Sequence, residues 1–436
     1  MDKKFDLNTV KLGLVGLGYV GLPLAVSFAN KIEVVGYDKS KVRIRELMNG
    51  FDATGEVDIS DLLKAKRLKL FNEIENLKDC NCFIVAVPTP VDNNKVPDLS
   101  ALENACKDVG SVLKSGDIII FESTVFPGAT EEICAPILEK VSGLNFISGS
   151  DNEANDGFYL GYSPERVNPG DKSRRISDIV KITSASTLKA AEYVDQLYKI
   201  VVGAGTHMAE SIKIAEAAKI IENVQRDVNI ALMNELSIVF NKMGISTQAV
   251  LKAAQTKWNF VPFYPGLVGG HCIGVDPYYL AHKSKEFGCT PEVILAGRRI
   301  NEAMPAHTAY LIVKLMLRQQ ITLSNSRVLM LGATFKENCP DLRNSKSIAL
   351  AQNLIEFGCQ VDVIDPLVDD EIMEKLNVFA SINQQWLGSY DAVVLAVPHQ
   401  CFLSDGVEQI KKYQKKHSVF FDVRCAFGPD ASDGSL

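Results

Sequence analysis

Cys272 has surroundings unlike those of a cysteine kept only for packing. It stands in Gly269-Gly270-His271-Cys272-Ile273-Gly274-Val275-Asp276, within a stretch rich in aromatic residues and proline. A thiolate is a nucleophile, and glycines beside it let a substrate approach closely and offer N–H donors to an oxyanion. Asp276 follows four residues later, which is one turn if the segment is helical, and could manage a proton or a water. The pattern favours a nucleophile, and a packing or turn role for this loop is the alternative.

A second set of polar side chains shares one face of an expected helix. Residues 207–241 contain neither proline nor glycine, and Lys219, Asn223 and Arg226 are spaced i, i+4 and i+7 within them. A solvated charged stripe is the ordinary explanation of such spacing. The residues around the three are apolar, namely Ile214, Ala218, Ile221 and Ile230. This favours a face turned to an interior cleft, where a lysine of lowered pKa could stabilise an alkoxide or relay a proton.

A glycine turn near the start of the chain predicts the element that positions a dinucleotide. An apolar run at residues 11–16 predicts a strand, and Gly16-Leu-Gly18-Tyr-Val-Gly21 then leads into a helical stretch. Gly16 permits the tight turn, Gly18 the approach of a pyrophosphate, and Gly21 close packing of helix on strand. The diphosphate is expected at the helix N-terminus.

The residue that ends the next strand indicates which dinucleotide is bound. The apolar run at residues 32–37 is followed by Asp38, which would accept hydrogen bonds from an adenosine ribose and repel a 2′-phosphate. NAD is therefore favoured over NADP. Lys39 and Arg43 lie nearby and leave NADP open.

The order of strands and helices predicts an α/β fold of two Rossmann-like doubly wound domains joined by a central all-helical region. After residue 325 the early pattern returns: residues 327–332 resemble the first strand, and residues 361–365 resemble the second strand with its acid. The expected domains are 1–205, 206–322 and 323–436. The second α/β domain lacks the full glycine fingerprint, so we expect it to bind something other than a dinucleotide. The tail after Phe427 is rich in glycine, serine and aspartate and is expected to be frayed.

Composition excludes several classes of protein. The 436 residues include 46 Lys and Arg against 53 Asp and Glu, a formal net charge of -7, which argues against binding of nucleic acid or of membrane surfaces. No apolar stretch approaches the roughly 18 residues of a membrane span, and the polar start lacks a signal-peptide core. The ten cysteines lack the spacing of a disulfide framework or a zinc site, so we expect a reducing cytoplasm and no metal.

Taken together, the motifs resemble the UDP-sugar 6-dehydrogenase family, the relatives of UDP-glucose dehydrogenase and GDP-mannose dehydrogenase. They occur in order along nearly the whole chain, at residues 16–21, 122–128, 162–166, 219–223, 269–277 and 335–343. Residues 256–277 resemble the branch that acts on UDP-N-acetylglucosamine or UDP-N-acetylgalactosamine and makes uronic acids for bacterial O-antigen and capsule. Whether the C4 hydroxyl is gluco or galacto is left open, and UDP-glucose and UDP-ManNAc are alternative substrates.

The resemblance implies a four-electron oxidation of the sugar C6 alcohol to a carboxylate, with two NAD used in succession. Cys272 would trap the aldehyde as a thiohemiacetal and then carry a thioester that water hydrolyses. A water held by Lys219, or Asp276, would take the hydroxyl proton, and Lys219 and Asn223 would stabilise the oxyanions. Glu165 or Asp276 would activate the hydrolytic water through Thr124, and the two carboxylates are rivals for that task.

The fingerprint and the resemblance together predict the binding residues. The NAD set is Gly16, Gly18, Tyr19, Val20, Gly21, Asp38, Arg43, Pro88, Thr89, Ser123, Thr124 and Arg343. The UDP-sugar set is Glu165, Arg166, Val167, Lys219, Asn223, Arg226, Tyr264, Gly266, Gly269, Phe335, Lys336 and Arg424. Thr89 could instead be a rigid strand exit, Lys336 and Arg343 a solvated loop, and Arg424 a surface charge. His271 tunes sugar choice or simply fills the loop.

Relatives in this family are dimers or larger, with the central helices at the interface, so a homodimer or dimer of dimers is expected. Lys257 or Arg298 is a candidate to reach the sugar of the neighbouring subunit. Two other functions are less consistent with these residues. A two-electron β-hydroxyacid dehydrogenase has no use for Cys272 or a second nucleotide domain, and a non-catalytic regulator responsive to NAD or a nucleotide sugar needs no nucleophile.

Overall fold

The computed structural model describes residues 5–92, 94–149, 156–166, 176–368 and 386–436. They form two compact units, which we call the first unit (Met1–Glu222 and Tyr278–Gly288) and the second unit (Asn223–Pro277 and Cys289–Leu436). The helices α7 (Ile212–Met243) and α9 (Asp276–Glu286) each contribute residues to both. The domain limits expected at residues 205 and 322 stay a prediction.

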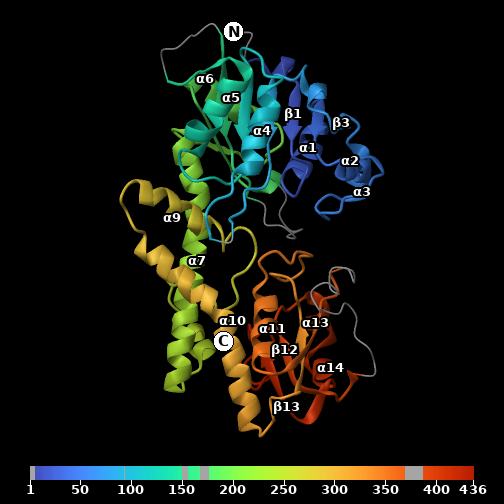
Figure 1. Ribbon diagram of the computed structural model, residues 1–436, viewed down its shortest axis with the longest axis vertical. Helices are drawn as coiled ribbons and strands as arrows, with labels where there is room; N and C mark the ends of the chain where they lie inside the picture. Colours follow the sequence, from blue (N-terminus) through green and yellow to red (C-terminus); the bar gives the residue numbers. More distant parts are fainter. Residues whose placement is uncertain (1–4, 93, 150–155, 167–175, 369–385) are drawn as a thin grey trace. The chain divides into compact units, whose positions relative to one another are not determined.

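The first unit is built on a nine-stranded sheet of order β3-β2-β1-β4-β5-β7-β8-β9, with β6 paired to β7 (Figure 1). The pair β7–β8 is antiparallel, and the other pairs of this sheet within the described residues are parallel. The strands are β1 (Leu12–Val15), β2 (Val34–Tyr37), β3 (Leu68–Phe71), β4 (Cys82–Val85), β5 (Ile118–Phe121), β6 (Asn145–Phe146), β7 (Gly157–Tyr162), β8 (Lys181–Ala185) and β9 (Thr206–Met208). The α-helices before α7 are α1 (Gly21–Ala29), α2 (Lys41–Met48), α3 (Ile59–Lys64), α4 (Ser100–Gly110), α5 (Ala135–Ser142) and α6 (Leu188–Lys199). Short 3-10 turns are η2 (Leu7–Thr9), η3 (Ile74–Leu77) and η5 (Ile176–Asp178), and η4 (Thr130–Cys134) is a π-helical turn before α5.

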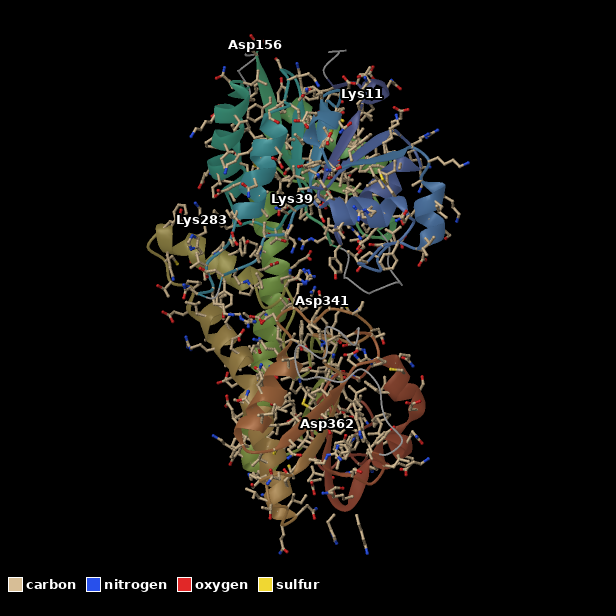
Figure 2. The ribbon with its side chains drawn as sticks, turned by 45° about the vertical axis from the view of Figure 1, so that its right-hand side comes forward. Lys11, Lys39, Asp156, Lys283, Asp341 and Asp362 are labelled. Atoms are coloured by element: carbon tan, nitrogen blue, oxygen red, sulfur yellow. The ribbon has the colours of Figure 1, made fainter. Side chains whose placement is uncertain are left out.

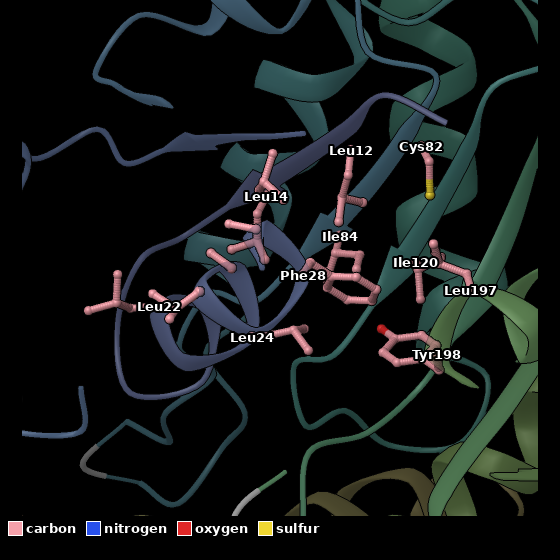
Figure 3. Packing of buried hydrophobic residues seen from close by; sticks show 14 of the residues in the cluster. Leu12, Leu14, Leu22, Leu24, Phe28, Cys82, Ile84, Ile120, Leu197 and Tyr198 are labelled. Atoms are coloured by element: carbon pink, nitrogen blue, oxygen red, sulfur yellow. The ribbon is translucent and has the colours of Figure 1, made fainter. Parts of the chain in front are cut away.

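The central strands of the first unit are apolar along their whole length because helices cover both faces of the sheet. All residues of β1, β4 and β5 are buried, as expected for parallel strands. Figure 3 shows Leu12 and Leu14 of β1 and Ile84 of β4 packed with Phe28 of α1. The ring of Phe28 meets that of Tyr198 on α6 edge to face, with centroids 5.9 Å apart. This core holds the carboxyl ends of the strands in fixed positions.

The second unit contains a four-stranded parallel sheet of order β11-β10-β12-β13 (Figure 1). Its strands are β10 (Arg327–Leu331), β11 (Gln360–Ile364), β12 (Tyr390–Leu395) and β13 (Gln414–Asp422). One face packs on α10 (Glu292–Arg318) and α11 (Lys346–Glu356), and the other on α13 (Gln400–Asp405) and α14 (Val407–Lys411). The order β11-β10-β12-β13 repeats β2-β1-β4-β5 of the first unit. The predicted fold, two Rossmann-like sheets with a helical region between them along the chain, is therefore confirmed.

The helices that lie between the two sheets along the chain are α7, α8 (Thr247–Ala254), α9 and α10. The long uninterrupted α7 agrees with the absence of proline and glycine from residues 207–241, and α10 contains the buried Pro305. Within the described ranges, no helix has both the length and the apolar character needed to cross a bilayer.

The C-terminal tail is ordered, so the expectation of a frayed end is wrong. Asp422 N donates to Gly434 O (3.0 Å), Asp433 N donates to Phe420 O (2.8 Å), and Leu436 is 4% exposed. The tail pairs with β13, an edge strand whose backbone groups would otherwise be open to solvent. A Cβ added to Gly434 would lie 2.9 Å from Leu315 Cδ1, so the glycine that suggested flexibility serves close packing.

Candidate active site

The glycine turn after β1 leaves room for an anion beside the start of α1. Gly16 has φ +91°, and an added Cβ would lie 2.7 Å from Ala86 O. At Gly21 the added Cβ would lie 1.8 Å from Gly16 O, whereas at Gly18 it would have no atom within 4 Å. Helix α1 begins after Val20 without a side-chain cap. No side-chain cap therefore stands between an anion and this helix start, where Leu22 N donates to Gly18 O (3.1 Å) and Pro23 has no N–H.

Asp38 follows β2 and lies beside this turn. Its Oδ2 accepts from Leu17 N (3.0 Å) and its Oδ1 from Ser40 N (2.9 Å). The carboxylate is half-buried, and each oxygen keeps acceptor capacity for a ribose hydroxyl. Lys39, labelled in Figure 2, is exposed.

Arg43 is held within the first unit by its own neighbours. Its Nε donates to Leu17 O (2.9 Å) and its guanidinium pairs with the buried Asp52 at 2.7 Å. Burial opposes the charge of Asp52, but hydrogen bonds from Thr54, Val57 and Arg43 lower the pKa of this carboxyl. Arg43 therefore stabilises the glycine turn through its contact with Leu17. Its contact with a cofactor stays a prediction.

The other predicted NAD residues of the first unit lie just beyond β4 and β5. Ser123 Oγ donates to Val87 O (2.7 Å), which links the two strand exits, and Tyr279 OH donates to Thr89 O (2.9 Å). Thr124 is half-buried at the same edge. Carboxyl ends of parallel strands are the usual place for ligands in such sheets.

A buried ionic cluster, which we call the Lys181 cluster, lies at this edge and consists of Glu122, Glu165, Lys181 and Tyr198. Lys181 Nζ contacts Glu122 Oε2 at 2.6 Å and Glu165 Oε2 at 3.3 Å, and Tyr198 OH donates to Glu122 Oε1. Burial raises the pKa of Glu122 to about 7, although Lys181 opposes the shift. Burial also disfavours the charge of Lys181, but the two carboxylates outweigh it and raise the pKa of the lysine.

Sequence reasoning named only Glu165 of this cluster. Lys181 begins β8, and a lysine at a strand end carries no local sign of burial. Glu122 was noticed only as part of a motif. Glu122 directly follows the apolar strand β5, which could have drawn attention to it, whereas β8 has the sequence KITSA and gives no such signal for Lys181.

Arg166 ties the segment after β7 to helix α7. Its guanidinium donates to Lys219 O (3.1 Å) and Ala218 O (2.9 Å) and pairs with Glu222 (2.7 Å). Lys219 itself is 6% exposed. The neighbouring Val167, also predicted to bind substrate, lies outside the described residues.

The polar residues Lys219, Asn223 and Arg226 of α7 are buried only in part, and the apolar residues beside them do not mark the buried face as expected. Lys219 and Asn223 are buried, but Arg226 is exposed. Ile214 and Ile221, taken as signs of an interior cleft, are themselves 48% and 55% exposed. That argument is wrong for these two residues, because a helix buries a face, and apolar residues beside that face can remain in solvent.

Glu216 on α7 is a further buried carboxylate that sequence reasoning missed. It accepts from Gly128 N (2.5 Å) and Thr130 N (2.9 Å), and burial raises its pKa to about 7. It thereby fixes the segment that follows Thr124.

Cys272 lies in a turn that leads directly into α9. Its carbonyl accepts from Val275 N (3.0 Å) and Asp276 N (2.9 Å), so Cys272 and Asp276 are one helical turn apart, as the spacing predicted. Cys272 is partly exposed, whereas Asp276 is 2% exposed. Asn223 Nδ2 donates to Asp276 Oδ2 at 2.6 Å, and Arg226 donates to Asn223 Oδ1 at 3.3 Å. The Cys272 thiol, the Asp276 carboxylate and the Asn223 amide thus all belong to the second unit. Asp276 follows Cys272 by one helical turn, and Asn223 is hydrogen-bonded to Asp276.

The loop before Cys272 packs on the segment between β10 and α11. A Cβ added at Gly269 would lie 2.7 Å from Asn344 O, and one at Gly270 (φ +80°) would lie 2.7 Å from the ring of Phe335. Asn344 Nδ2 donates to Gly270 O (3.1 Å). His271 meets Phe335 edge to face and lies 3.6 Å from Asp341, so its side chain fills space between these loops.

The backbone of Gly266 is fixed by a residue that sequence reasoning did not select. Asn234 Oδ1 accepts from Gly266 N (2.8 Å), and Asn234 Nδ2 donates to Gly266 O (3.0 Å). Asn234 is fully buried. Tyr264, two residues earlier, is 44% exposed and accepts from Gln255 Nε2 (2.9 Å).

Two of the cations predicted for the second unit, Arg343 and Arg424, are paired with nearby acids. Arg343 donates to both oxygens of Asp341, which is labelled in Figure 2, and Arg424 pairs with Glu337 at 3.2 Å. Lys336 lies 5.7 Å from the centroid of the Phe335 ring. Their ligand contacts stay predictions.

Arg298 is not available to a neighbouring subunit, so that expectation is corrected. It is 1% exposed and pairs with Asp227 at 2.6 Å and with Glu302. Breaking a buried pair would leave Asp227 uncompensated. Lys257, the other candidate, is exposed.

The predicted catalytic residues are divided between the units. Thr124, Glu165 and Lys219 belong to the first unit, and Asn223, Cys272 and Asp276 to the second.

Comparison with known proteins identifies the family. Three models of the UDP-glucose/GDP-mannose dehydrogenase family match: the NAD binding domain at residues 10–202, the central domain at 213–303 and the UDP binding domain at 329–429. A UDP-N-acetyl-D-glucosamine 6-dehydrogenase of Pseudomonas aeruginosa is 53% identical over 427 residues, covering 98% of this chain and 99% of the relative. One from Salmonella typhi is 50% identical over 432 residues, covering 99% and 100%.

A solved structure agrees with the sequence relatives. The UDP-D-ManNAc dehydrogenase of Pyrococcus horikoshii has a TM-score of 0.84 and 32% identity over 95% of both chains. The glycine turn, the Cys272 turn and these matches lead to one conclusion: the chain belongs to the UDP-glucose/GDP-mannose dehydrogenase family, whose members are NAD-dependent oxidoreductases.

Proposed function

We propose that this enzyme oxidises C6 of UDP-N-acetyl-D-glucosamine from alcohol to carboxylate, with two NAD per sugar, through covalent intermediates on Cys272. The observation that carries the proposal is the Cys272 turn, which places Asp276 one turn from the thiol and Asn223 on that carboxylate. Two relatives of at least 50% identity bear the name of this activity, which favours the gluco over the galacto sugar.

The residues of the glycine turn suit NAD. Gly18 gives room for a pyrophosphate, no side chain caps the start of α1 where the diphosphate would lie, and Asp38 would accept from a ribose. Bound NAD supplies the hydride acceptor for each of the two oxidations. Ser123, Thr124, Pro88 and Thr89 would border it at the strand exits.

Cys272 performs the covalent part of the reaction. Its thiolate adds to the C6 aldehyde and forms a thiohemiacetal, which holds the reactive aldehyde while the cofactor is exchanged. After the second oxidation, water attacks the thioester, the C–S bond breaks and the carboxylate is released. Asn223 and Lys219 would stabilise the oxyanions, and Glu165 and Asp276 are the two carboxylates that could take the proton of the water.

The active form is proposed to be a cytoplasmic homodimer, or a dimer of dimers, that serves surface polysaccharide synthesis. Helices α7 and α10 of the second unit expose large apolar residues, which supports an interface between copies. They include Leu232, Val239, Met243, Tyr310 and Leu317.

The stoichiometry of NADH tests the reaction. Two NADH formed per UDP-N-acetyl-D-glucosamine consumed is the expected result. One per sugar would indicate a two-electron dehydrogenase, and none would overturn the proposed activity on this substrate. A parallel assay with UDP-N-acetyl-D-galactosamine decides between the two epimers.

A Cys272→Ser variant tests the covalent step. We expect steady-state turnover to fall by roughly a thousandfold or more while NAD affinity is unchanged. Cys289→Ser is the matched control, because Cys289 is exposed and outside the site. Turnover equal to that of the control would remove the thioester from the mechanism.

A further inference from the structure

Gly266 is a glycine for which the fold itself supplies no reason. It is buried, its φ is not positive, and a Cβ added to it would have no atom within 4 Å. Among the glycines of the described residues, only Gly18 and Gly266 combine these last two properties. Gly18 is the residue of the glycine turn that leaves room for a pyrophosphate. By the same reasoning, the open side of Gly266 is a place where a ligand can approach the backbone closely.

Both polar backbone groups of Gly266 are held by one side chain, that of Asn234 on α7. Asn234 Oδ1 accepts from Gly266 N at 2.8 Å, and Asn234 Nδ2 donates to Gly266 O at 3.0 Å. Asn234 is fully buried, so these bonds stand in place of the water that the backbone groups have lost. Two bonds to one residue fix its position and also the direction in which its open side faces.

The Asn234 amide is itself oriented by α10. Asn234 Nδ2 also donates to Asn301 Oδ1 at 2.8 Å, and Asn301 Nδ2 donates to the backbone and side-chain oxygens of Asp227 at 3.0 and 2.8 Å. All three side chains are fully buried, and Arg298 pairs with the Asp227 carboxylate at 2.6 Å. Because each amide has a donor end and an acceptor end, this series of bonds permits one orientation of Asn234. The two helices thus form a rigid support for Gly266.

The segment that begins at Gly266 leads to Cys272 and is held again before it. Asn344 Nδ2 donates to Gly270 O at 3.1 Å. Gly266, Gly270, Asn344 and Cys272 all belong to the second unit. Gly266 also lies within the match to the central domain of the family, whereas the UDP binding domain matches residues 329–429. Since Cys272 is expected to reach C6, the part of the substrate nearest to this segment is the hexosamine rather than the uridine.

We propose that Asn234 is a positioning residue that fixes the Gly266 peptide so that its open side receives the hexosamine ring of the substrate. This rests on the proposed function. Asn234 is fully buried and its amide is bonded to Gly266 and Asn301, so it acts on the sugar through Gly266. A shift of this peptide by about 1 Å would separate it from the ring, and misplacement on that scale can cost about 100-fold.

The test compares the affinities of UDP-N-acetyl-D-glucosamine and of UDP for the wild type and for Asn234→Asp. Titration calorimetry without NAD measures both, because no oxidation occurs without a hydride acceptor. The new carboxylate would face Gly266 O and Asn301 Oδ1, which are both acceptors, so the peptide should move. We expect binding of the UDP-sugar to weaken by about 10- to 100-fold. The affinity for UDP, which lacks the hexosamine, should not change.

Two further variants complete the test. Asn229→Asp is the matched control, because Asn229 lies on the same helix and its Nδ2 donates to Gln225 O of that helix. Both affinities should equal those of the wild type in this control. If Asn234→Asp does not fold, Asn234→Ala replaces it, since it removes both bonds to Gly266 without adding a charge. Thermal unfolding establishes that each variant is folded.

Gly266→Ala tests the open side directly and does not depend on the folding of an Asn234 variant. The free protein accommodates the methyl group, because φ is not positive and no atom lies within 4 Å of it. Its thermal unfolding should therefore equal that of the wild type. The methyl group would meet the sugar, so we expect the UDP-sugar to bind about tenfold more weakly, or less tightly still, and UDP to bind as before.

The proposal is overturned if the Asn234 variant binds the UDP-sugar as tightly as the wild type does. It is also overturned if the affinities for UDP and for the UDP-sugar fall by the same factor, because Asn234 would then only stabilise the fold. Wild-type affinity of Gly266→Ala for the UDP-sugar would show that the hexosamine does not lie at the open side. Failure of the proposed function is recognised separately, because the wild type itself would then not form two NADH per sugar.

Discussion

The two Rossmann-like sheets share the order of four strands, β2-β1-β4-β5 and β11-β10-β12-β13, and differ at the turn that follows the first strand of each. In both, a glycine of positive φ follows the first strand: Gly16 at +91° and Gly332 at +97°. Each donates its N–H to the last residue of the next strand, Tyr37 O at 2.9 Å and Ile364 O at 2.7 Å. Each sheet then places an aspartate after that strand, Asp38 and Asp365.

The two aspartates, Asp38 and Asp365, show how the surroundings of the two turns differ. Asp38 is half-buried and accepts one amide on each oxygen. Asp365 is fully buried: its Oδ2 accepts from Ala333 N and Thr334 N and contacts His399 Nε2, and its Oδ1 accepts from Leu367 N. The second acid is 0% exposed and is held by three backbone amides and His399, so it is not accessible to a ribose.

The helices that follow the turns differ in the same sense. Helix α1 begins directly after residues 16–20 and has no side-chain cap. Helix α11 begins after residues 332–345, and its N-cap Ser345 accepts from Ile348 N and donates to Ala333 O at 2.5 Å. The comparison teaches that two turns on the same strand order can differ in what fills them. Side chains of the protein occupy the second turn, whereas no side chain caps the helix that follows the first.

Gly21→Ala should have the largest effect on this comparison. The added Cβ would lie 1.8 Å from Gly16 O, so backbone must move, and we expect a loss of about 3 kcal/mol in the free energy of unfolding. Urea denaturation measures it. A wild-type midpoint would mean that close contact of α1 with the turn is not what the glycine provides.

Asp365→Asn should come next, at about 2–3 kcal/mol, because the new amide would face backbone donors. Burial alone would raise the pKa of Asp365, but His399 and the amides of Ala333 and Thr334 lower it below 3.8. Its contribution to stability is thus present above about pH 4 and lost as the pH falls further. In the variant, Tm should fall less steeply as the pH is lowered below about 4. Asp38→Asn is the control, because we expect it to change stability little. If the dependence of Tm on acid pH were the same in the variant as in the wild type, the interpretation that these contacts hold Asp365 ionised would be contradicted.

Gly18→Ala should leave stability unchanged and weaken NAD binding. Since no atom lies within 4 Å of the added Cβ, the free protein accommodates it, but a pyrophosphate would meet it. We expect about 10- to 100-fold lower affinity, or roughly 1.4–2.7 kcal/mol, by titration calorimetry. Affinity for UDP is the internal control. Equal NAD affinity would place the diphosphate elsewhere.

Ser345→Ala should have the smallest effect, about 1 kcal/mol, through loss of the cap of α11. Thermal unfolding measures it, with Ser246→Ala at the cap of α8 as the matched variant. NAD affinity should not change. A fall in NAD affinity would show that the second sheet takes part in binding that cofactor.

Short-range spacing is what the sequence by itself determined. The glycine fingerprint, the two acids after β2 and β11, and the single turn between Cys272 and Asp276 all follow from the fixed periods of strands and helices. The same periods placed Lys219 and Asn223 on one face of α7. These features were predicted because their partners are a few residues away along the chain.

Only the tertiary structure decided which side chains and backbone groups contact the buried charges and the edge strand β13. Lys181 meets Glu122, 59 positions away, because β5, β7 and β8 are neighbours in the sheet. His399 contacts Asp365, a pairing that the sequence did not predict, and the tail pairs with β13, where composition alone suggested a frayed end. A buried charge or an edge strand is stabilised by whichever partner the fold brings to it, and that partner's distance along the chain has no period from which it could be predicted.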